Sequence, residues 1–221
     1  MFGVLTKHNF HRSLRVDHIL TGTQKTDQLI TNLGDNDIHV RSKAVDALTS
    51  ISKTEVIDLL ITLLQKDSTR IIKEGACKAL GKIGDIRATD VLIENLNDPD
   101  ESVRYQATIA LGQIGDLKAV QPLIQVYQKQ DDPLVRSEAA KALGLIGDPS
   151  ALKILISALK KEDDRFIKYH TVTSLGRIGD SKAKKPLQKI IKDNDDDRLV
   201  LRAMEAIESI EKANQPKVVA G

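Results

Sequence analysis

Few side chains in this sequence are of a type and spacing that could carry out chemistry. Three of the five histidines, His8, His11 and His18, would share one face of a helix, an arrangement that could bind a metal ion. No glutamate or cysteine accompanies them in this short segment. We therefore interpret residues 1–21 as a solvated N-terminal cap or flexible segment and predict no metal site.

The single cysteine, Cys77, is matched by Thr108 and Ala140 in the next two copies of an internal repeat. A small, buried slot of this kind favours an inert structural thiol over a reactive one. The aspartate-rich stretches lack the loop spacing of a calcium-binding hand, and the Gly-x-x-Gly pattern ends helices rather than following strands. We predict neither catalytic residues nor a cofactor, and the chain is more consistent with a non-enzyme.

The composition is that of a folded protein with an aliphatic core. Of the 221 residues, 41% are hydrophobic and 29% charged, whereas aromatic residues make up only 3%. Lys and Arg number 33 against 31 Asp and Glu, a balance that does not favour nucleic acid as the partner. No apolar run approaches the roughly 18 residues of a membrane span. With one cysteine and no visible signal peptide, we predict a reduced, cytoplasmic protein.

The chain is built from an internal repeat. The string Leu-Gly-x-Ile-Gly-Asp occurs four times, and its leucines, 31, 32 and 32 residues apart, are Leu80, Leu111, Leu143 and Leu175. Degenerate copies at Leu48 and Ile207 lack both glycines, as expected for the ends of a stack. Six copies therefore fill about 22–53, 54–85, 86–116, 117–148, 149–180 and 181–212. We expect residues 213–221 to be a frayed C-terminal tail.

Each copy is expected to form two helices. Apolar residues at helical spacing mark the first helix, and a residue able to cap a helix start precedes the second. The six predicted caps are Asp37, Thr69, Asp100, Asp132, Asp164 and Asp196. In the four full motifs the first glycine predicts close helix packing and the second predicts a left-handed helix end, after which the aspartate caps the next copy.

The copy from Val135 to Asp148 closely resembles the HEAT repeat and, more narrowly, the short HEAT-like repeat of phycobilisome lyase subunits and many microbial scaffold proteins. The resemblance covers residues 22–212 and implies an all-α fold, an α-solenoid of six HEAT-like helix pairs. It also implies that a basic residue in the second helix pairs with a loop aspartate between neighbouring copies. That residue is Arg41, Lys73, Arg104, Arg136 and Lys168 in turn, and Val200 takes its place in the sixth copy.

In HEAT-like arrays the second helices line the concave face, so the resemblance implies that this surface binds a partner. In each second helix, the positions that differ between copies are expected to point outward on this face, whereas the repeated positions point into the stack. Gly75, Ser137 and Glu138 occupy such variable positions. Aromatic anchors with an arginine rim are typical of protein-binding surfaces. The predicted partner-binding residues are Arg70, Ile71, Lys78, Lys82, Tyr105, Gln106, Ile109, Leu134, Lys141, Leu145, Phe166, Tyr169, His170 and Arg177.

Three functions remain open at this point. We favour a non-enzymatic scaffold or adaptor that binds a protein or peptide on the concave face. The resemblance alone supports the alternative, a subunit of a bilin lyase or isomerase or a chaperone for a chromophore-bearing protein. Nucleic-acid binding along a stripe of Lys78, Lys82, Lys141, Arg165 and Arg177 ranks below both, since the repeats are neutral. The sequence does not indicate the oligomeric state.

Overall fold

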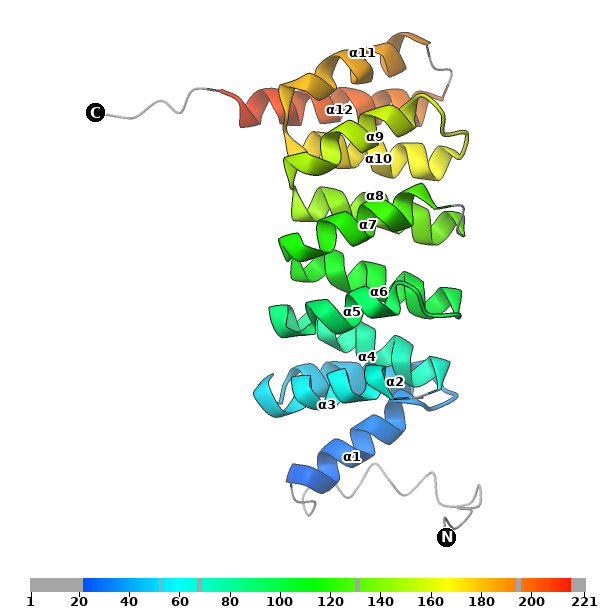
Figure 1. Cartoon of the computed structure of the whole chain (residues 1–221), viewed down its shortest axis with the longest axis vertical. Helices are drawn as coiled ribbons and strands as arrows, with labels where there is room; N and C mark the ends of the chain where they lie inside the picture. The colour runs from blue at the N-terminus through cyan, green and yellow to red at the C-terminus, as the bar shows by residue number, and fades with distance from the viewer. Residues whose placement is uncertain (1–21, 52, 67–68, 130–131, 194–195, 216–221) are drawn as a thin grey trace, which may run out of the picture.

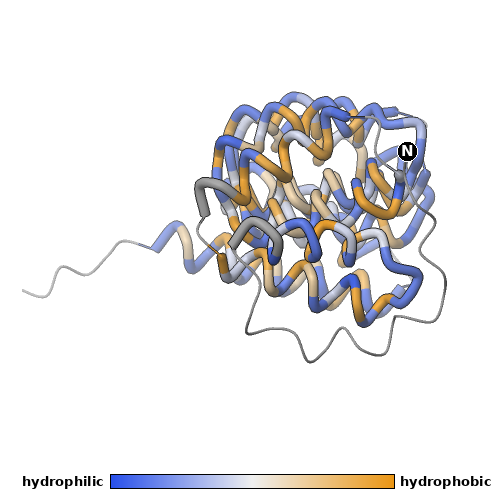
Figure 2. Tube along the Cα trace, turned by 90° about the horizontal axis from the view of Figure 1, so that it is seen from below, coloured by the Kyte–Doolittle hydropathy of each residue, from blue (hydrophilic) through white to orange (hydrophobic). Residues whose placement is uncertain are grey.

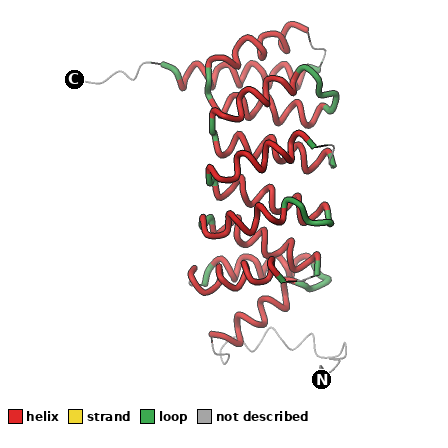
Figure 3. Tube along the Cα trace, viewed as in Figure 1, coloured by secondary structure: helices red, strands yellow, loops and turns green. Residues whose placement is uncertain are grey.

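The structure is a computed structural model that describes residues 22–51, 53–66, 69–129, 132–193 and 196–215. Over these residues the chain forms twelve α-helices and no strand (Figure 3). Figure 1 shows the helices stacked in pairs along the long axis, with α1 at one end and α11 and α12 at the other. The prediction of an all-α solenoid of six helix pairs is confirmed. His8, His11 and His18 lie outside the described residues.

Each pair consists of a first and a second helix joined by a short loop. The first helices are α1 (Gly22–Leu33), α3 (Lys53–Gln65), α5 (Thr89–Asn95), α7 (Val120–Gln128), α9 (Leu152–Leu159) and α11 (Lys184–Asp193). The second helices are α2 (Ile38–Thr49), α4 (Arg70–Ile83), α6 (Glu101–Ile114), α8 (Pro133–Ile146), α10 (Arg165–Ile178) and α12 (Asp197–Ala213). A single 3-10 turn precedes four of the first helices: η2 (Ile86–Ala88), η3 (Leu117–Ala119), η4 (Pro149–Ala151) and η5 (Ser181–Ala183).

The second helices begin as the sequence predicts, with one exception. Five of the six predicted caps accept a backbone N–H bond on their carboxylate, and Asp132 shows the pattern with Pro133 at the first helical position. Thr69 has the extended backbone of a cap residue, but its hydroxyl makes no capping hydrogen bond. The prediction of a side-chain cap is therefore wrong at α4. The aspartates after the glycine motifs cap the 3-10 turns instead of the first helices directly.

The glycines inside the second helices permit close contact between successive repeats. A Cβ on Gly81 would lie 2.8 Å from the Cα of Ala110 in the next second helix, closer than real Cβ atoms approach a backbone atom. The same holds for the pairs Gly112–Ala142, Gly144–Ser174 and Gly176–Ala206, at 2.9, 2.6 and 2.8 Å. The second glycine of each motif ends its helix in the left-handed region, for example Gly84 with φ of 71°. Both predicted roles of the glycines are confirmed.

The core between the helix layers is aliphatic, and hydrophobic and hydrophilic segments alternate along the helices (Figure 2). Leucines of the repeat motif, such as Leu80 and Leu143, are buried. Tyr127 is the buried aromatic residue among those described, and its hydroxyl lies 2.9 Å from the Thr171 hydroxyl, within hydrogen-bonding distance. None of the described helices is long and apolar enough to cross a membrane.

The basic residue of the second helices contacts carboxylates and loop carbonyls. Lys73 pairs with the buried carboxylate of Asp98 in the next repeat, with 2.8 Å between Nζ and Oδ2. Arg136 pairs with Glu162 rather than an aspartate. Arg41 and Arg104 donate hydrogen bonds to carbonyl oxygens of their own repeat, those of Asp35 at 2.8 Å and Asp98 at 2.9 Å. A planar guanidinium has five donors, so it can bond to loop carbonyls in this way and still has donors left for a carboxylate.

Candidate interaction surface on the second helices

The second-helix face is the surface formed by the outward sides of α2, α4, α6, α8, α10 and α12. Successive helices of this layer contact one another along the whole stack, in part through the glycine contacts. All fourteen predicted partner-binding residues lie on α4, α6, α8 and α10, and none of them is buried. The structure thus brings these side chains to one surface, and their role in binding stays a prediction.

Three positions that the sequence places outward are buried. Gly75 lies beneath Leu33, whose Cδ2 would be 3.0 Å from an added Cβ. The Ser137 hydroxyl donates a hydrogen bond to the Leu134 carbonyl at 2.9 Å. Glu138 is only 6% exposed and accepts a bond from Lys141 at 2.8 Å. Repeat register gives the direction of a side chain, but it does not reveal which neighbouring side chains cover it.

Apolar side chains follow the N-terminal halves of the second helices. Leu134 is 65% exposed, Phe166 60% and Leu201 58%, and they lie on the successive helices α8, α10 and α12. Ile71 on α4 is half-buried at the position that matches Leu134. We call these four residues, together with Tyr105 and Tyr169, the apolar band. Leu201 was absent from the predicted set, although it directly follows Val200 and so occupies the register position of Tyr105 and Tyr169.

The two tyrosines of the apolar band are fixed by their neighbours. Tyr105 and Tyr169 are half-buried and pack against the hydrophobic core. The Arg202 guanidinium of α12 lies over the Tyr169 ring, 4.7 Å from its centroid, and donates a hydrogen bond to the phenolic oxygen. The His170 ring meets the Tyr169 ring edge-on at 5.6 Å. Tyr169 is therefore held in place by its neighbours, whereas Phe166 is exposed.

Cationic side chains follow the middle and C-terminal halves of α4, α8 and α10. We call Lys78, Lys82, Lys141 and Arg177 the cationic band. Lys82 pairs with Asp46 at 2.6 Å and lowers the pKa of that exposed carboxyl. Lys141 pairs with the buried Glu138. Lys78 and Arg177 are exposed, and exposed ion pairs such as Lys82–Asp46 are weak enough to exchange for a partner's carboxylates.

His170 lies between the two bands on α10. Burial lowers its pKa below the usual value, and the positive charges of Lys141, Arg177 and Arg202 act in the same direction. Glu138 opposes these effects. The ring is therefore neutral near pH 7, and it can offer both a hydrogen-bond donor and an acceptor to a partner.

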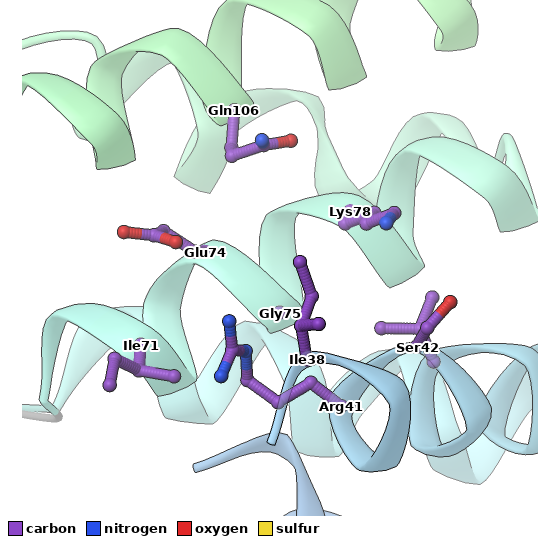
Figure 4. A pocket seen from close by; sticks show the side chains of 9 residues that line it. Ile38, Arg41, Ser42, Ile71, Glu74, Gly75, Lys78 and Gln106 are labelled. Atoms are coloured by element: carbon purple, nitrogen blue, oxygen red, sulfur yellow. The ribbon is translucent and has the colours of Figure 1, made fainter. Parts of the chain in front are cut away.

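A cavity of about 140 Å³ opens on the second-helix face between α2 and α4. Figure 4 shows its lining side chains, which include Ile38 and Arg41 of α2, Glu74 and Lys78 of α4, and Gln106 of α6. Burial raises the pKa of Glu74. Its Oε1 atom is buried without a hydrogen bond, although the Arg70 Nε atom lies 3.6 Å away. Glu74 was not among the predicted partner-binding residues; it is the single acidic residue of α4, which carries four basic residues.

The described residues contain no arrangement suited to catalysis at a metal or a thiol. Among them, no group of three or more His, Cys, Asp or Glu side chains could hold a metal ion. Cys77 is fully buried in the core, and burial raises the pKa of its thiol to about 12. This confirms the predicted buried, structural cysteine.

Six stacked helix pairs and a continuous second-helix face define this chain as an α-solenoid. It belongs to the family of HEAT-repeat proteins, because the model described as HEAT repeats matches residues 26–112, 89–172 and 120–208. The narrower resemblance to phycobilisome lyase subunits stays a prediction. None of the curated proteins matches the sequence.

Solved structures of several helical-repeat proteins are similar to this chain. An engineered protein is 20% identical, with a TM-score of 0.57 over 85% of this chain and 97% of that one. A designed armadillo repeat protein in complex with the peptide (KR)4 is 18% identical, with a TM-score of 0.57 over 84% and 99% of the two chains. The CpcE–CpcF complex of phycocyanin lyase from Nostoc sp. is 20% identical, with a TM-score of 0.43 over 86% and 95%. At these identities the likeness shows the fold alone.

Proposed function

We propose that this protein is a non-enzymatic scaffold or adaptor that binds a protein or peptide on its second-helix face. The observation that carries the proposal is the exposure of Leu134, Phe166 and Leu201 on three successive second helices. Burying one such side chain in an interface contributes about 1.5–3 kcal/mol. Exposed apolar residues on neighbouring elements, flanked by cations, are typical of protein-binding surfaces.

The packing of the second helices supports the same proposal. At contacts such as Gly112 against Ala142 and Gly144 against Ser174, neighbouring second helices lie too close together for even a Cβ to fit between them. The backbone therefore sets the spacing of the apolar band in the free protein. Binding a partner then requires little loss of conformational entropy from the scaffold. A designed armadillo repeat protein of similar fold has been solved with a bound peptide, so an array of this kind can accommodate one.

The two alternatives drawn from the sequence receive no specific support. A bilin lyase subunit that acts through a thiol would need a reactive cysteine, whereas Cys77 is buried with a raised pKa. That alternative still rests on the resemblance alone. A nucleic-acid interface would need many phosphate contacts along the face, yet the chain is nearly neutral, with 33 Lys and Arg against 31 Asp and Glu.

The proposal predicts that partner capture depends on the apolar band. We expect the double variant Leu134→Ser with Phe166→Ser to lose the proteins that the wild-type chain captures from a native lysate. The matched control, Ile86→Ser with Leu117→Ser, alters two residues of similar exposure on the inter-repeat 3-10 turns and should capture the same proteins. Quantitative mass spectrometry of the captured proteins makes the comparison. Equal capture by both variants would contradict the proposal.

A further inference from the structure

We infer that the partner contributes an acidic amphipathic segment that lies along the axis of the stack, across the second helices. Its apolar side faces the apolar band, and its carboxylates face the cationic band. This inference rests on the proposed function, because it names the chemistry of the partner that the same face would bind. Four observations carry it: the order of the two bands, the distribution of charge, the length of the face and the sequences of the chain's own terminal segments.

The two bands run side by side along the stack. On α4, Ile71 precedes Lys78 by seven residues, and on α8, Leu134 precedes Lys141 by seven. With a rise of about 1.5 Å per residue, the backbone positions of the two residues in each pair lie about 10 Å apart along the helix axis. On α10, Phe166 and Arg177 are eleven residues apart, which corresponds to about 16 Å. An α-helix with its side chains is about 10–12 Å across, so one helix laid along the stack reaches both bands.

Two of the second helices carry a net positive charge although the chain as a whole is nearly neutral; the first helix α11, in the other layer, is basic as well. The α4 helix carries Arg70, Lys73, Lys78 and Lys82 against the single acidic residue Glu74. The α10 helix carries Arg165, Lys168 and Arg177 and no acidic residue. The carboxylates that balance them lie largely in the loops and at the helix caps. Charge complementarity across an interface selects the partner's sign, so this face favours carboxylates.

The length of the face sets the length of the segment. The band residues from α4 to α10 lie on four successive second helices. Packed helices are about 8–10 Å apart, so three steps cover roughly 24–30 Å. A helical segment of about 16–20 residues spans that distance. The (KR)4 peptide of the armadillo complex has the opposite charge, and we expect this face to reject such a peptide.

The chain's own terminal segments do not fit the face. Residues 1–21 contain Lys7, Arg12 and Arg15 against Asp17, and residues 213–221 contain Lys217 without an acidic residue. Both segments are basic and would be repelled by the cationic band.

The test titrates the full-length protein into a fluorescent synthetic peptide of 20 residues. This acidic peptide carries Leu and Phe on one helical face and Glu on the other. A second, basic peptide has the same sequence with Lys in place of every Glu. We expect fluorescence anisotropy to show binding of the acidic peptide, weakened by added salt, and no saturable binding of the basic one. Lys78→Glu with Arg177→Glu should weaken binding by about tenfold or more. Lys118→Glu with Lys153→Glu, on η3 and α9, is the matched control and should bind as the wild type does.

The outcomes separate this inference from the proposed function. If the basic peptide binds as tightly as the acidic one, and Leu134→Ser with Phe166→Ser abolishes that binding, the inference is overturned and the proposed function stands. Failure of the acidic peptide to bind overturns the inference, and the lysate comparison then decides the proposed function alone. Displacement of the acidic peptide by a 20-nucleotide single strand, or self-association of the protein that blocks the peptide, would also overturn the inference. Equal affinity of the cationic-band variant and its control would do so as well.

Discussion

The Arg202 guanidinium of α12 covers the ring of Tyr169 on α10 and donates a hydrogen bond to its phenolic oxygen. This contact joins the fifth repeat to the sixth, where the basic residue of the repeat frame has been replaced by Val200. Arg202 thus ties the last helix pair to the array through an aromatic ring. The same ring belongs to the apolar band, so one residue serves both the stack and the candidate surface.

Tyr169 and Phe166 are expected to differ in their effect on stability, although both belong to the apolar band. Tyr169→Ala removes a ring that packs against the core and the Arg202 contact, so it should lower the free energy of unfolding by about 2–4 kcal/mol. Phe166 is 60% exposed, and Phe166→Ala should change that free energy by about 0.5 kcal/mol or less. Urea unfolding followed by circular dichroism measures both. Equal losses would contradict this description of Tyr169.

The glycine contacts predict a position-dependent cost of adding one methyl group. In Gly144→Ala the new Cβ would meet the Ser174 Cα at 2.6 Å, which forces α8 and α10 apart and should cost about 1–3 kcal/mol. Gly75→Ala is the control, because its Cβ would meet only the side chain of Leu33, at 3.0 Å for the nearest atom. The end of the Leu33 side chain needs to shift by only a few tenths of an ångström, and alanine gains roughly 1 kcal/mol over glycine within a helix. We expect thermal unfolding to show a large loss for Gly144→Ala and little or none for Gly75→Ala.

The lowered pKa of His170 predicts that the folded protein loses stability in mild acid. Its pKa in the folded protein is lowered by burial and by the surrounding cations, so the unfolded chain binds a proton more readily than the folded chain does. The stabilisation is present above the unfolded value of about 6.5 and is lost as the pH falls through the lower folded value. His170→Gln should therefore reduce the change in unfolding free energy between pH 7.5 and pH 5. An identical pH dependence in both proteins would show that His170 titrates freely.

Cys77 should be unreactive in the folded protein. Its thiol is buried, and a pKa of about 12 leaves almost no thiolate at pH 8. We expect an aromatic disulfide reagent to modify no thiol in native buffer and one thiol per chain in 6 M urea. Rapid modification of the native protein would contradict the buried position between the helix layers.

The fold could be predicted because its determinants recur at fixed spacing. Gly81 predicts a close helix contact and Gly84 predicts a helix end. Each glycine alone is a weak signal, but their recurrence at Gly112 and Gly115 defines the register of the repeat. The candidate surface was harder to predict from the sequence. Sequence register placed Glu138 outward, whereas it lies buried beside Lys141, and it overlooked Leu201 because the repeat frame is degenerate at Val200. Such details depend on side-chain conformation and on the packing of neighbouring helices, which no single repeat encodes.

The most direct test of the account is an amide chemical-shift map of the isotope-labelled protein titrated with the acidic amphipathic peptide. The account predicts that the shifts concentrate on α4, α6, α8 and α10, with the largest near Ile71, Leu134, Phe166 and Arg177. The first helices α5, α7 and α9 should show little change, because they form the other layer of the stack. Shifts concentrated on those first helices, or no shifts at saturating peptide, would contradict the claim that the second-helix face binds an acidic segment.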